Sequence, residues 1–424
     1  MKFVHLYRTF YRGNALFLCL LMLCFSGCAG QLPGEAAPSF DTGAVTGMEE
    51  TPVVDYGVPQ YAPNILVNQR GYPVGEDKYA IVKGSRLPED FRLMEAEGGT
   101  AVYTGSIEEI DYNDELALYV GRLDFGDYRE EGSYYIECDI VGQSLRFSIE
   151  KGLYETIFTE LLEQVYRECE ERTVSLSDMI ALLTVYEWYP ELFAQEEGLT
   201  PGVLELMVDW IGVQEEDSTL YAAFLAKFCY LYQKFDRKYA TDCLQLASSL
   251  YEKNRSVLQT DAESFFALAE LYRATGLYTY RKQIYDYKDF FENNSSYMEN
   301  KEYLYGAMTY MVTRQKVDVD LCSSFMDEIM SRGEEISKRY MDMIHPVAEK
   351  NNGCDDLLKC TSELACANYI MNNYQYNDIM EEFWHYLMGR NKESICFYPE
   401  QGSHSGYILL LAQLAATHRT EPET

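Results

Sequence analysis

The sequence predicts a multidomain protein with a β part followed by an α part: a small antiparallel β-sandwich, then an (α/α)6 toroid of about twelve helices. Three observations lead to this prediction. Apolar and polar residues alternate between positions 64 and 150, the apolar period changes to 3.6 after Lys151, and every second helical segment is more apolar than its neighbours. Paired helices joined by short loops favour a ring of antiparallel hairpins.

Composition agrees with a folded, acidic protein. The 424 residues have 47% hydrophobic content, which is enough for two or three domains and excludes disorder over most of the chain. Asp and Glu number 68 against 35 Lys and Arg, and the formal net charge is −33. Such a surface repels phosphate backbones, so we expect no nucleic-acid partner.

Residues 1–27 have the layout of a secretory signal peptide. A basic segment precedes an apolar run at 15–25 that is too short to span a bilayer, and Ser26 and Gly27 then precede Cys28. This ending resembles the bacterial lipobox. The resemblance implies that Cys28 is diacylated, so that membrane lipid anchors the protein outside the cytoplasm, at the surface of a bacterial cell. An ordinary signal peptide with an incidental cysteine is the alternative.

Residues 28–60 are rich in Gly, Pro, Ala and acidic residues and predict a flexible acidic linker. Residues 61–150 follow as the sandwich. Their short alternating runs predict about seven antiparallel strands, with hairpin turns at Gly98–Gly99 and Val141–Gly142.

Residues 151–424 predict the helical ring. Its helices are expected to begin near Tyr154, Ser175, Thr200, Ser218, Asp236, Thr260, Thr279, Asn300, Asp318, Gly353, Asn377 and His404. Thr260 with Glu263 predicts a capping box. The more apolar helices, expected to line the ring, are those near 175–189, 218–232, 262–272, 301–312, 358–371 and 405–417.

Metal and cofactor sites are not predicted. Nine cysteines follow Cys28 without a Cys-x-x-Cys pair, and the five histidines form no His-x-x-x-His pair. We interpret the cysteines as mostly buried thiols. No compact carboxylate loop indicates a calcium site.

Several segments resemble a known family in order along the chain. ILVNQRGYPVGEDKYAIVKG at 65–84 resembles the immunoglobulin-like domain that precedes the catalytic barrel in many family 9 glycoside hydrolases, the cellulases. ALLTVYEWYPELF at 181–193 resembles the second barrel helix of that family, and YLMGRN at 386–391 resembles its Leu-Gly-Arg-Asn segment. The resemblance extends from about Asn64 to His418 and implies inverting hydrolysis of β-1,4-glucans.

The catalytic motifs of the family do not accompany this resemblance. An inverting enzyme needs a base and a protonated acid roughly 6.5–9.5 Å apart. The family base belongs to an Asp-Ala-Gly-Asp motif between the first two barrel helices, where this chain has only a short connection and Gln164–Arg167 align with the motif. Asp178 is the nearest carboxylate downstream, and an ordinary helix position is its simpler interpretation.

The family acid is a Glu before the final helix. In SICFYPEQGSHSG at 394–406, Glu400 is the carboxylate of that loop and His404 its histidine, without the His- and Arg-rich stretch of the family. Pro399 and Gly402 flank Glu400 as turn residues do, which favours a surface loop. Glu400 and Asp178 are therefore the catalytic candidates, both by position alone.

Three functions remain open. We favour a degenerate, surface-tethered relative that binds a β-glucan or another polysaccharide, or acts as a scaffold, without hydrolysis. The alternatives are an active endo-β-1,4-glucanase and a cell-surface protein-interaction module. Aromatic residues near the ends of the inner helices are candidates for stacking on sugars, although core packing explains most of them. They are Tyr186, Trp188, Tyr189, Tyr230, Tyr232, Tyr303 and Tyr305.

Overall fold

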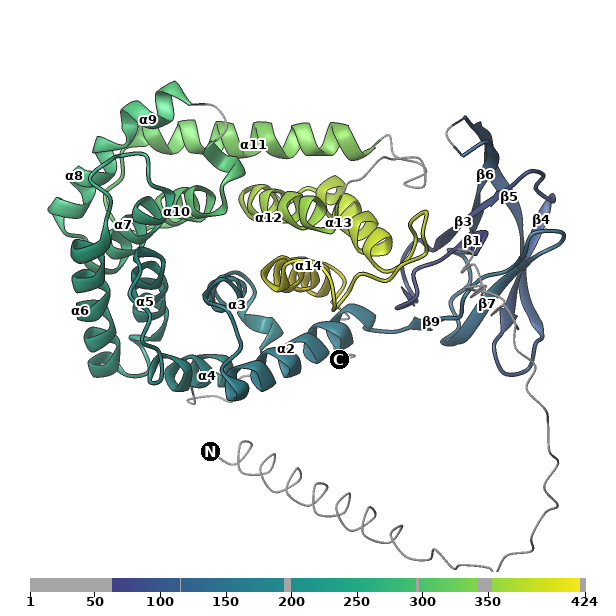
Figure 1. The fold of residues 1–424 in the computed structure, drawn as a ribbon, viewed down its shortest axis with the longest axis horizontal. Helices are drawn as coiled ribbons and strands as arrows, with labels where there is room; N and C mark the ends of the chain where they lie inside the picture. The colour runs from purple at the N-terminus through teal and green to yellow at the C-terminus, as the bar shows by residue number, and fades with distance from the viewer. Residues whose placement is uncertain (1–62, 115, 194–199, 295–296, 342–352, 420–424) are drawn as a thin grey trace, which may run out of the picture. The chain divides into compact units, whose positions relative to one another are not determined.

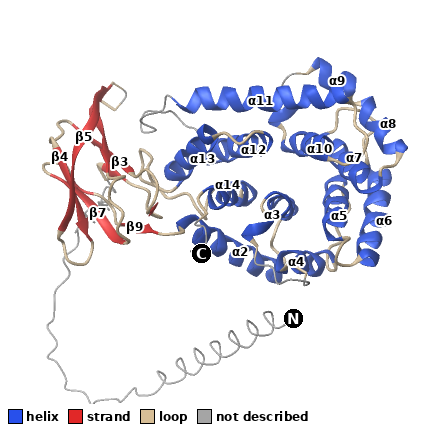
Figure 2. Cartoon of the chain, turned by 180° about the vertical axis from the view of Figure 1, so that it is seen from behind, coloured by secondary structure: helices blue, strands red, loops and turns tan. Residues whose placement is uncertain are grey.

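The computed structural model describes residues 63–114, 116–193, 200–294, 297–341 and 353–419. Strands lie in the first part of this region and helices in the second (Figure 2). The predicted signal peptide (residues 1–27) and the whole predicted linker (residues 28–60), Cys28 included, fall outside the described residues. Among the helices that are described, none combines the length and hydropathy that a membrane span requires.

The β part has nine described strands, three of which are only two residues long. They are β1 (Ile65–Leu66), β2 (Tyr72–Pro73), β3 (Tyr79–Gly84), β4 (Asp90–Glu95), β5 (Ala101–Asn113), β6 (Leu118–Asp124), β7 (Gly132–Cys138), β8 (Gly142–Gln143) and β9 (Phe147–Glu150). The strand order is β1-β3-β6-β5-β4-β7-β9-β2, with β8 beside β7. One pair departs from the antiparallel prediction, because β2 pairs parallel to β9.

Strand β5 connects the two sheets of the sandwich. Its first half pairs with β4 and its second half with β6, with a register shift after Glu108. Buried side chains from both sheets, including Val82, Phe91, Leu123 and Ile136, form the β core. The predicted turn between β4 and β5 is confirmed, with Gly99 at a φ of 62°, a conformation that costs glycine little.

Every predicted helical segment is helical in the structure. The helices are α2 (Leu153–Glu171), α3 (Leu176–Trp188), α4 (Gly202–Ile211), α5 (Thr219–Tyr232), α6 (Arg237–Asn254), α7 (Ala262–Thr275), α8 (Tyr278–Asp286), α9 (Lys288–Asn293), α10 (Lys301–Val312), α11 (Val319–Met341), α12 (Cys354–Ile370), α13 (Tyr374–Leu387) and α14 (His404–Thr417). The segment predicted from Thr279 is interrupted at Tyr287 and forms both α8 and α9.

The six more apolar helices form a closed inner ring, as predicted. Helix α3 packs on α5, α5 on α7, α7 on α10, α10 on α12, α12 on α14, and α14 on α3 again. The remaining helices lie outside them (Figure 1). An inner helix contacts other helices on nearly all sides, and this explains why α3, α5 and α14 are apolar around most of their circumference.

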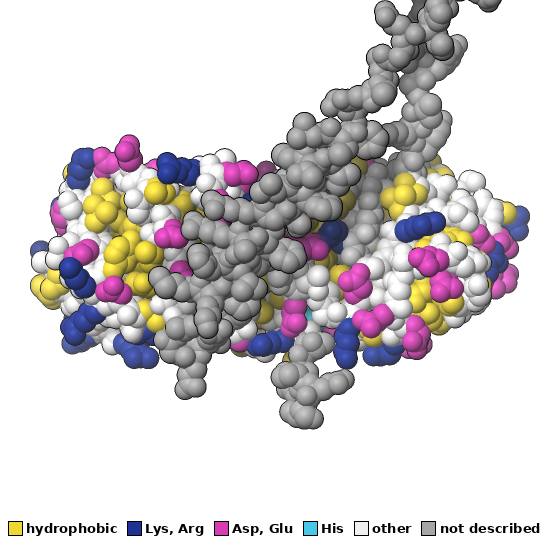
Figure 3. Space-filling model, turned by 90° about the horizontal axis from the view of Figure 1, so that it is seen from below, with side chains coloured by type: hydrophobic (Ala, Val, Ile, Leu, Met, Phe, Trp, Pro, Cys, Tyr) yellow, Lys and Arg dark blue, Asp and Glu magenta, His cyan; other side chains and the backbone are white. Residues whose placement is uncertain are grey.

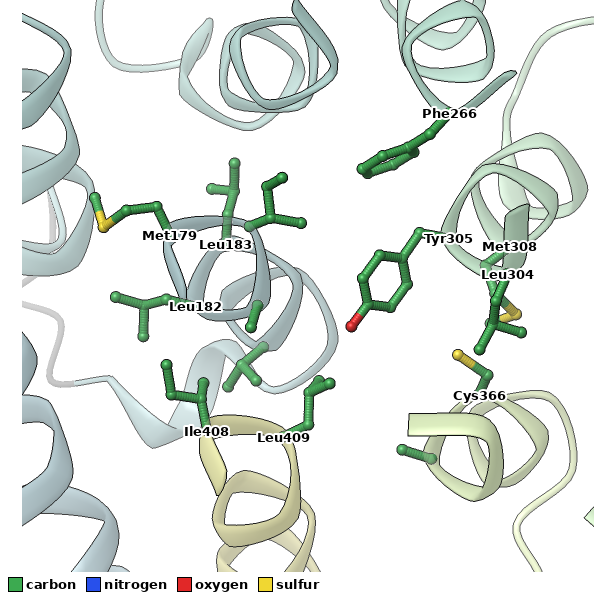
Figure 4. Close-up of a cluster of buried hydrophobic side chains, with 14 of the residues drawn as sticks. Met179, Leu182, Leu183, Phe266, Leu304, Tyr305, Met308, Cys366, Ile408 and Leu409 are labelled. Atoms are coloured by element: carbon green, nitrogen blue, oxygen red, sulfur yellow. The ribbon is translucent and has the colours of Figure 1, made fainter. Parts of the chain in front are cut away.

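Side chains fill the centre of the ring. Leu182, Phe266, Cys366 and Leu409 approach from four different helices, and Tyr305 of α10 extends between them toward α3 and α14 (Figure 4). Tyr305 is 7% exposed, and each of the other four is at most 3% exposed. Along this part of its axis the ring is a packed core.

The predicted capping box at Thr260 is wrong by one residue. Asp261 is the N-cap of α7, and its carboxylate accepts a hydrogen bond from the Ser264 backbone N–H at 2.9 Å. The third helical position is therefore Ser264, so Glu263 cannot complete the predicted box.

On the outer face drawn in Figure 3, side chains of both charges are interspersed with hydrophobic ones.

The segment that resembles Leu-Gly-Arg-Asn joins the helices to the sandwich. Arg390 has no exposed surface; its guanidinium lies 3.9 Å from the ring centroid of Tyr79 in β3 and pairs with Glu382 of α13. Asn68 donates a hydrogen bond from its side chain to Nδ1 of His385 at 2.8 Å, and the backbone N–H of Gln69 donates to the Met388 carbonyl at 2.8 Å. Buried polar contacts thus fix this junction.

Candidate functional site

The starts of α3 and α14 lie at the same end of the ring, because Ser177 in the first turn of α3 and Ser405 in the first turn of α14 line one pocket. Both are inner helices, and they pack on each other. The resemblance places the family base before the second barrel helix and the acid before the last, so both positions meet at this end, which we call the entry end. It is formed by the first turns of the inner helices.

Asp178 is tied into the beginning of α3. Its Oδ2 accepts hydrogen bonds from the Ser175 hydroxyl at 2.6 Å and from the Ser175 backbone N–H at 3.3 Å. The Ser175 hydroxyl oxygen in turn accepts from the Asp178 backbone N–H at 3.1 Å, which completes a capping box. Asp178 is 7% exposed, so its carboxylate is committed to the helix start and faces little solvent.

Glu400 lies in the loop between α13 and α14 and is exposed. Tyr398–Pro399 just before it is a cis peptide bond. His404, the first residue of α14, places its Nδ1 3.5 Å from Oε2 of Glu168 on α2. The histidine of this loop is therefore directed to the outer helix α2. The catalytic use of Glu400 and Asp178 stays a prediction.

A pocket at the entry end has room for about one water molecule. Its volume is 10 Å³, whereas pockets for small-molecule ligands have roughly 300 Å³ or more. It is lined by Ser177, Ile180, Leu220, Phe266, Lys301, Glu302, Tyr305 and Ser405. Lys301 donates from Nζ to the Ser177 hydroxyl at 3.1 Å and lies 4.0 Å from Glu302. This pocket does not admit a pyranose ring.

Sequence reasoning missed the carboxylates of α7 and α10 at this end. Glu302 lines the pocket, and the negative charge of Glu302 acts on the carboxyl group of Glu263. Burial, and then the charges of Asp261 and Glu302, raise the pKa of Glu263. Both residues occupy first turns, where acidic residues are common because they favour the helix dipole, so the sequence carried no signal of a site.

The opposite end of the ring contains a buried charge network, which was also not predicted. Glu187 of α3 forms ion pairs with Lys227 of α5 and Arg273 of α7. Glu270 of α7 lies 2.5 Å from Arg273 and 3.6 Å from Lys227, and its Oε1 accepts from the Thr309 hydroxyl of α10 at 2.8 Å. Two carboxylates and two cations thus bring four inner helices together with no net charge.

The network keeps Glu187 ionised. Burial alone raises the pKa of a carboxyl group, but Lys227 and Arg273 hold the pKa of Glu187 well below its ordinary value of 4.5. The Glu187 side chain is 15% exposed, against at most 4% for its three charged partners. Glu187 is therefore the charged group of the network that reaches solvent.

The aromatic candidates divide between core and surface. Tyr186, Tyr232, Tyr303 and Tyr305 are buried, which confirms core packing for them. Trp188, Tyr189 and Tyr230 are half-buried, and all three lie at the C-terminal ends of inner helices. Trp188 stacks on Tyr369 of α12, a residue that sequence reasoning missed, with ring centroids 4.9 Å apart and an interplanar angle of 20°.

Within the described ranges, no group of three His, Cys, Asp or Glu residues is arranged to hold a metal ion.

These features define a class: a β-sandwich of the kind attached to cellulases, followed by a closed helical ring. Residues 60–143 match the family described as cellulase N-terminal ig-like domain. No curated protein matches the sequence.

Solved structures give the particular fold, which is that of family 9 glycoside hydrolases. A metagenome-derived family 9 endoglucanase has a TM-score of 0.65 at 16% identity, over 80% of this chain and 85% of that one. A Bacteroides ovatus GH9 protein has a TM-score of 0.64 at 14% identity, over 84% and 99%. A thermostable endoglucanase from Alicyclobacillus acidocaldarius has a TM-score of 0.61 at 16% identity, over 79% of this chain and 83% of that one. The fold of the chain is thus GH9-like.

Proposed function

We propose that this protein is a GH9-like lipoprotein, tethered at the cell surface through Cys28, that binds a glycan or acts as a scaffold without hydrolysing it. One observation carries the proposal: at the entry end, where the resemblance places both catalytic groups, the pocket has a volume of 10 Å³. An inverting hydrolase must place a sugar, an acid, a base and a water molecule there.

The two candidate carboxylates support the same conclusion. Asp178 accepts hydrogen bonds that hold the first turn of α3, so abstracting a proton from water would require it to leave its cap. Glu400 is exposed in the loop before α14, so no enclosed site holds it against a glycosidic oxygen. The ring itself is preserved because it is held by core packing, which does not depend on a catalytic site.

A relative suggests the ligand class. AaCel9A has been solved in complex with cellobiose-like isofagomine. A β-1,4-glucan is therefore the first ligand to test for this chain.

The test measures turnover and binding on the same protein. Reducing ends released from a soluble β-1,4-glucan are quantified for wild type, Asp178→Asn and Glu400→Gln, and retention in a glucan-containing native gel is measured in parallel. We expect retention without turnover. Turnover that is lost in either variant would establish an active endoglucanase, and absence of both activities would favour a protein-interaction module.

The anchor is tested separately. Full-length protein produced in a bacterium with a lipoprotein pathway is expected in the membrane fraction, and Cys28→Ser is expected in the soluble extracytoplasmic fraction. A Cys28→Ser protein that stays with the membrane would contradict lipidation at this residue.

A further inference from the structure

The ring has a second end, formed by the last turns of the inner helices, and its aromatic residues are accessible there. We define the exit surface as Trp188, Tyr189, Tyr230 and Tyr369, with Glu187 and Arg273 beneath them. We propose that the exit surface binds a neutral pyranose unit of a β-linked glycan. This inference rests on the proposed glycan-binding function and assigns its site to the end opposite the one that the family resemblance indicates.

Tyr369 offers a fixed flat face. It is 40% exposed, and Trp188 covers one side of its ring. Trp188 is itself held edge-on by Tyr189, with centroids 6.5 Å apart and an interplanar angle of 86°. Tyr189 donates a hydrogen bond to Oε1 of Gln413 at 2.6 Å, which anchors this row of rings to α14. A ligand that stacks on Tyr369 therefore does not have to immobilise a freely rotating side chain.

Polar groups lie beside this face. The Arg273 guanidinium is 4.3 Å from the ring centroid of Tyr230, and Arg273 pairs with Glu187, whose side chain is 15% exposed. Glu187 directly precedes Trp188, the residue that stacks on Tyr369. In agreement with this placement, the charges of Glu187 and Arg273 act in opposite directions on the pKa of Tyr369, which burial raises. Glu187, the charged residue of the network whose side chain reaches solvent, thus supplies a carboxylate acceptor for a ligand hydroxyl.

This combination selects a neutral polyol over an ion. The two carboxylates and two cations of the network cancel, so the exit surface does not strongly attract either phosphate or metal cations. A β-glucopyranose unit has axial C–H bonds on its faces, which pack on an aromatic ring, and equatorial hydroxyl groups at its edge, which need acceptors and donors. The ring of Tyr369 and the carboxylate of Glu187 meet both requirements.

Several connections at this end are short. Residues 233–236 join α5 to α6, residues 276–277 join α7 to α8, and residues 371–373 join α12 to α13. These three connections build no high walls around the surface. One unit of an extended glycan can therefore reach Tyr369 while the rest of the glycan remains in solvent.

The experiment uses the protein with a soluble β-1,4-glucan as the probe. Trp210 is 5% and Trp384 0% exposed, so a change in tryptophan fluorescence on adding glucan reports mainly on Trp188. Tyr369→Ala is expected to weaken binding about tenfold, the loss of one stacking contact. Tyr369→Phe retains the ring and is expected to bind like wild type. Tyr285→Ala, which removes a 53% exposed tyrosine on the outer helix α8, is the matched control.

The outcomes separate this inference from the function on which it rests. Loss of binding in Tyr369→Ala, with binding retained in Tyr369→Phe and Tyr285→Ala, supports the exit surface. Equal retention of wild type and Tyr369→Ala in the glucan-containing native gel overturns the exit surface and leaves glycan binding intact at another place. Absence of retention by wild type in that gel, together with no fluorescence change, overturns both.

Discussion

His418 and Glu76 connect the end of the last helix to the sandwich: Nδ1 of His418 lies 2.8 Å from Oε1 of Glu76, in the segment between β2 and β3. Nε2 of the same ring lies 3.7 Å from Oε2 of Glu381 on α13, and Oε1 of Glu381 accepts from the Tyr154 hydroxyl at 2.6 Å. Asp378 adds a further negative charge near His418. One imidazole thus contacts both domains of the described protein.

The protonation of this cluster predicts how stability depends on pH. Burial lowers the pKa of His418, but Glu76 and Glu381 raise it more, to above 6.5. Burial raises the pKa of Glu381 to about 7, and the Glu76 carboxyl, hydrogen-bonded to His418, has its pKa lowered below 4.5. The contributions of His418 and Glu381 are lost as pH rises through these raised values, and that of Glu76 as pH falls through its lowered one. Between pH 4.5 and 6.5 His418 and Glu76 both contribute fully, whereas the contribution of Glu381 declines, so stability from this cluster is greatest near pH 4.5 and falls as the pH rises.

Thermal unfolding followed across this range is the measurement. The melting temperature should fall as the pH is raised from about 6 to about 8, and His418→Gln should flatten that slope. His404→Gln is the control, because it removes a histidine–glutamate pair at the other end of the same helix. The same slope in His418→Gln and wild type would contradict the assignment.

Removing one charge from the network of Glu187, Lys227, Glu270 and Arg273 should be costly. Glu187→Gln leaves a surplus positive charge in a buried place, and the free energy of unfolding should fall by about 3–5 kcal/mol in chemical denaturation. The double variant Glu187→Leu, Lys227→Met leaves the neutral Glu270–Arg273 pair and should lose less than the single variant. Lys253→Ala breaks an exposed pair with Asp217 and should have little effect. A double variant less stable than Glu187→Gln would show that charge balance is not the cause.

Gly306 should not tolerate alanine, although it lies within α10. A Cβ at this position would lie 2.7 Å from the ring of Phe265 and 3.2 Å from the Cα of Phe266 on α7. We expect Gly306→Ala to lower the free energy of unfolding by about 1–3 kcal/mol, despite the better helix propensity of alanine. Gly75→Ala meets no atom within 4 Å and is the control. A stabilised Gly306→Ala protein would show that α7 and α10 pack less closely.

The capping role of Asp178 predicts a cost in stability that is shared with Ser175. Ser175→Ala and Asp178→Ala should each lower the free energy of unfolding by about 1 kcal/mol, measured by denaturant titration. Because both residues belong to one box, the double variant should lose clearly less than the sum of the two losses. Additive losses would mean that the two side chains act separately.

The periodicity of the sequence was sufficient to predict the ring. An inner helix is enclosed by other helices, so segments such as 219–232 must be apolar on most sides, in contrast with the outer helices. Strand details were less predictable. Strands β1, β2 and β8 have two residues each, too few for an alternating pattern, and the parallel pairing of β2 with β9 depends on contacts distant in sequence.

The sites were harder to predict because their residues are brought together only by the closed ring. Glu187, Lys227 and Arg273 lie on three different helices, and each one alone reads as an ordinary charged residue near a helix end. Tyr369 gives no signal until α12 places it on Trp188. For Asp178 the sequence suggested an ordinary helix position, and the structure adds the partner, Ser175, that the carboxylate serves.

The contact of α14 with both α12 and α3 has a consequence for biogenesis. Until the ribosome has made residues 404–417, the apolar flanks of α3 and α12 have no neighbour to cover them. A chain whose first and last inner helices meet at a seam cannot finish folding from its amino terminus onward during synthesis. Nascent chains arrested before this segment should therefore depend on chaperones, however complete their earlier helices are.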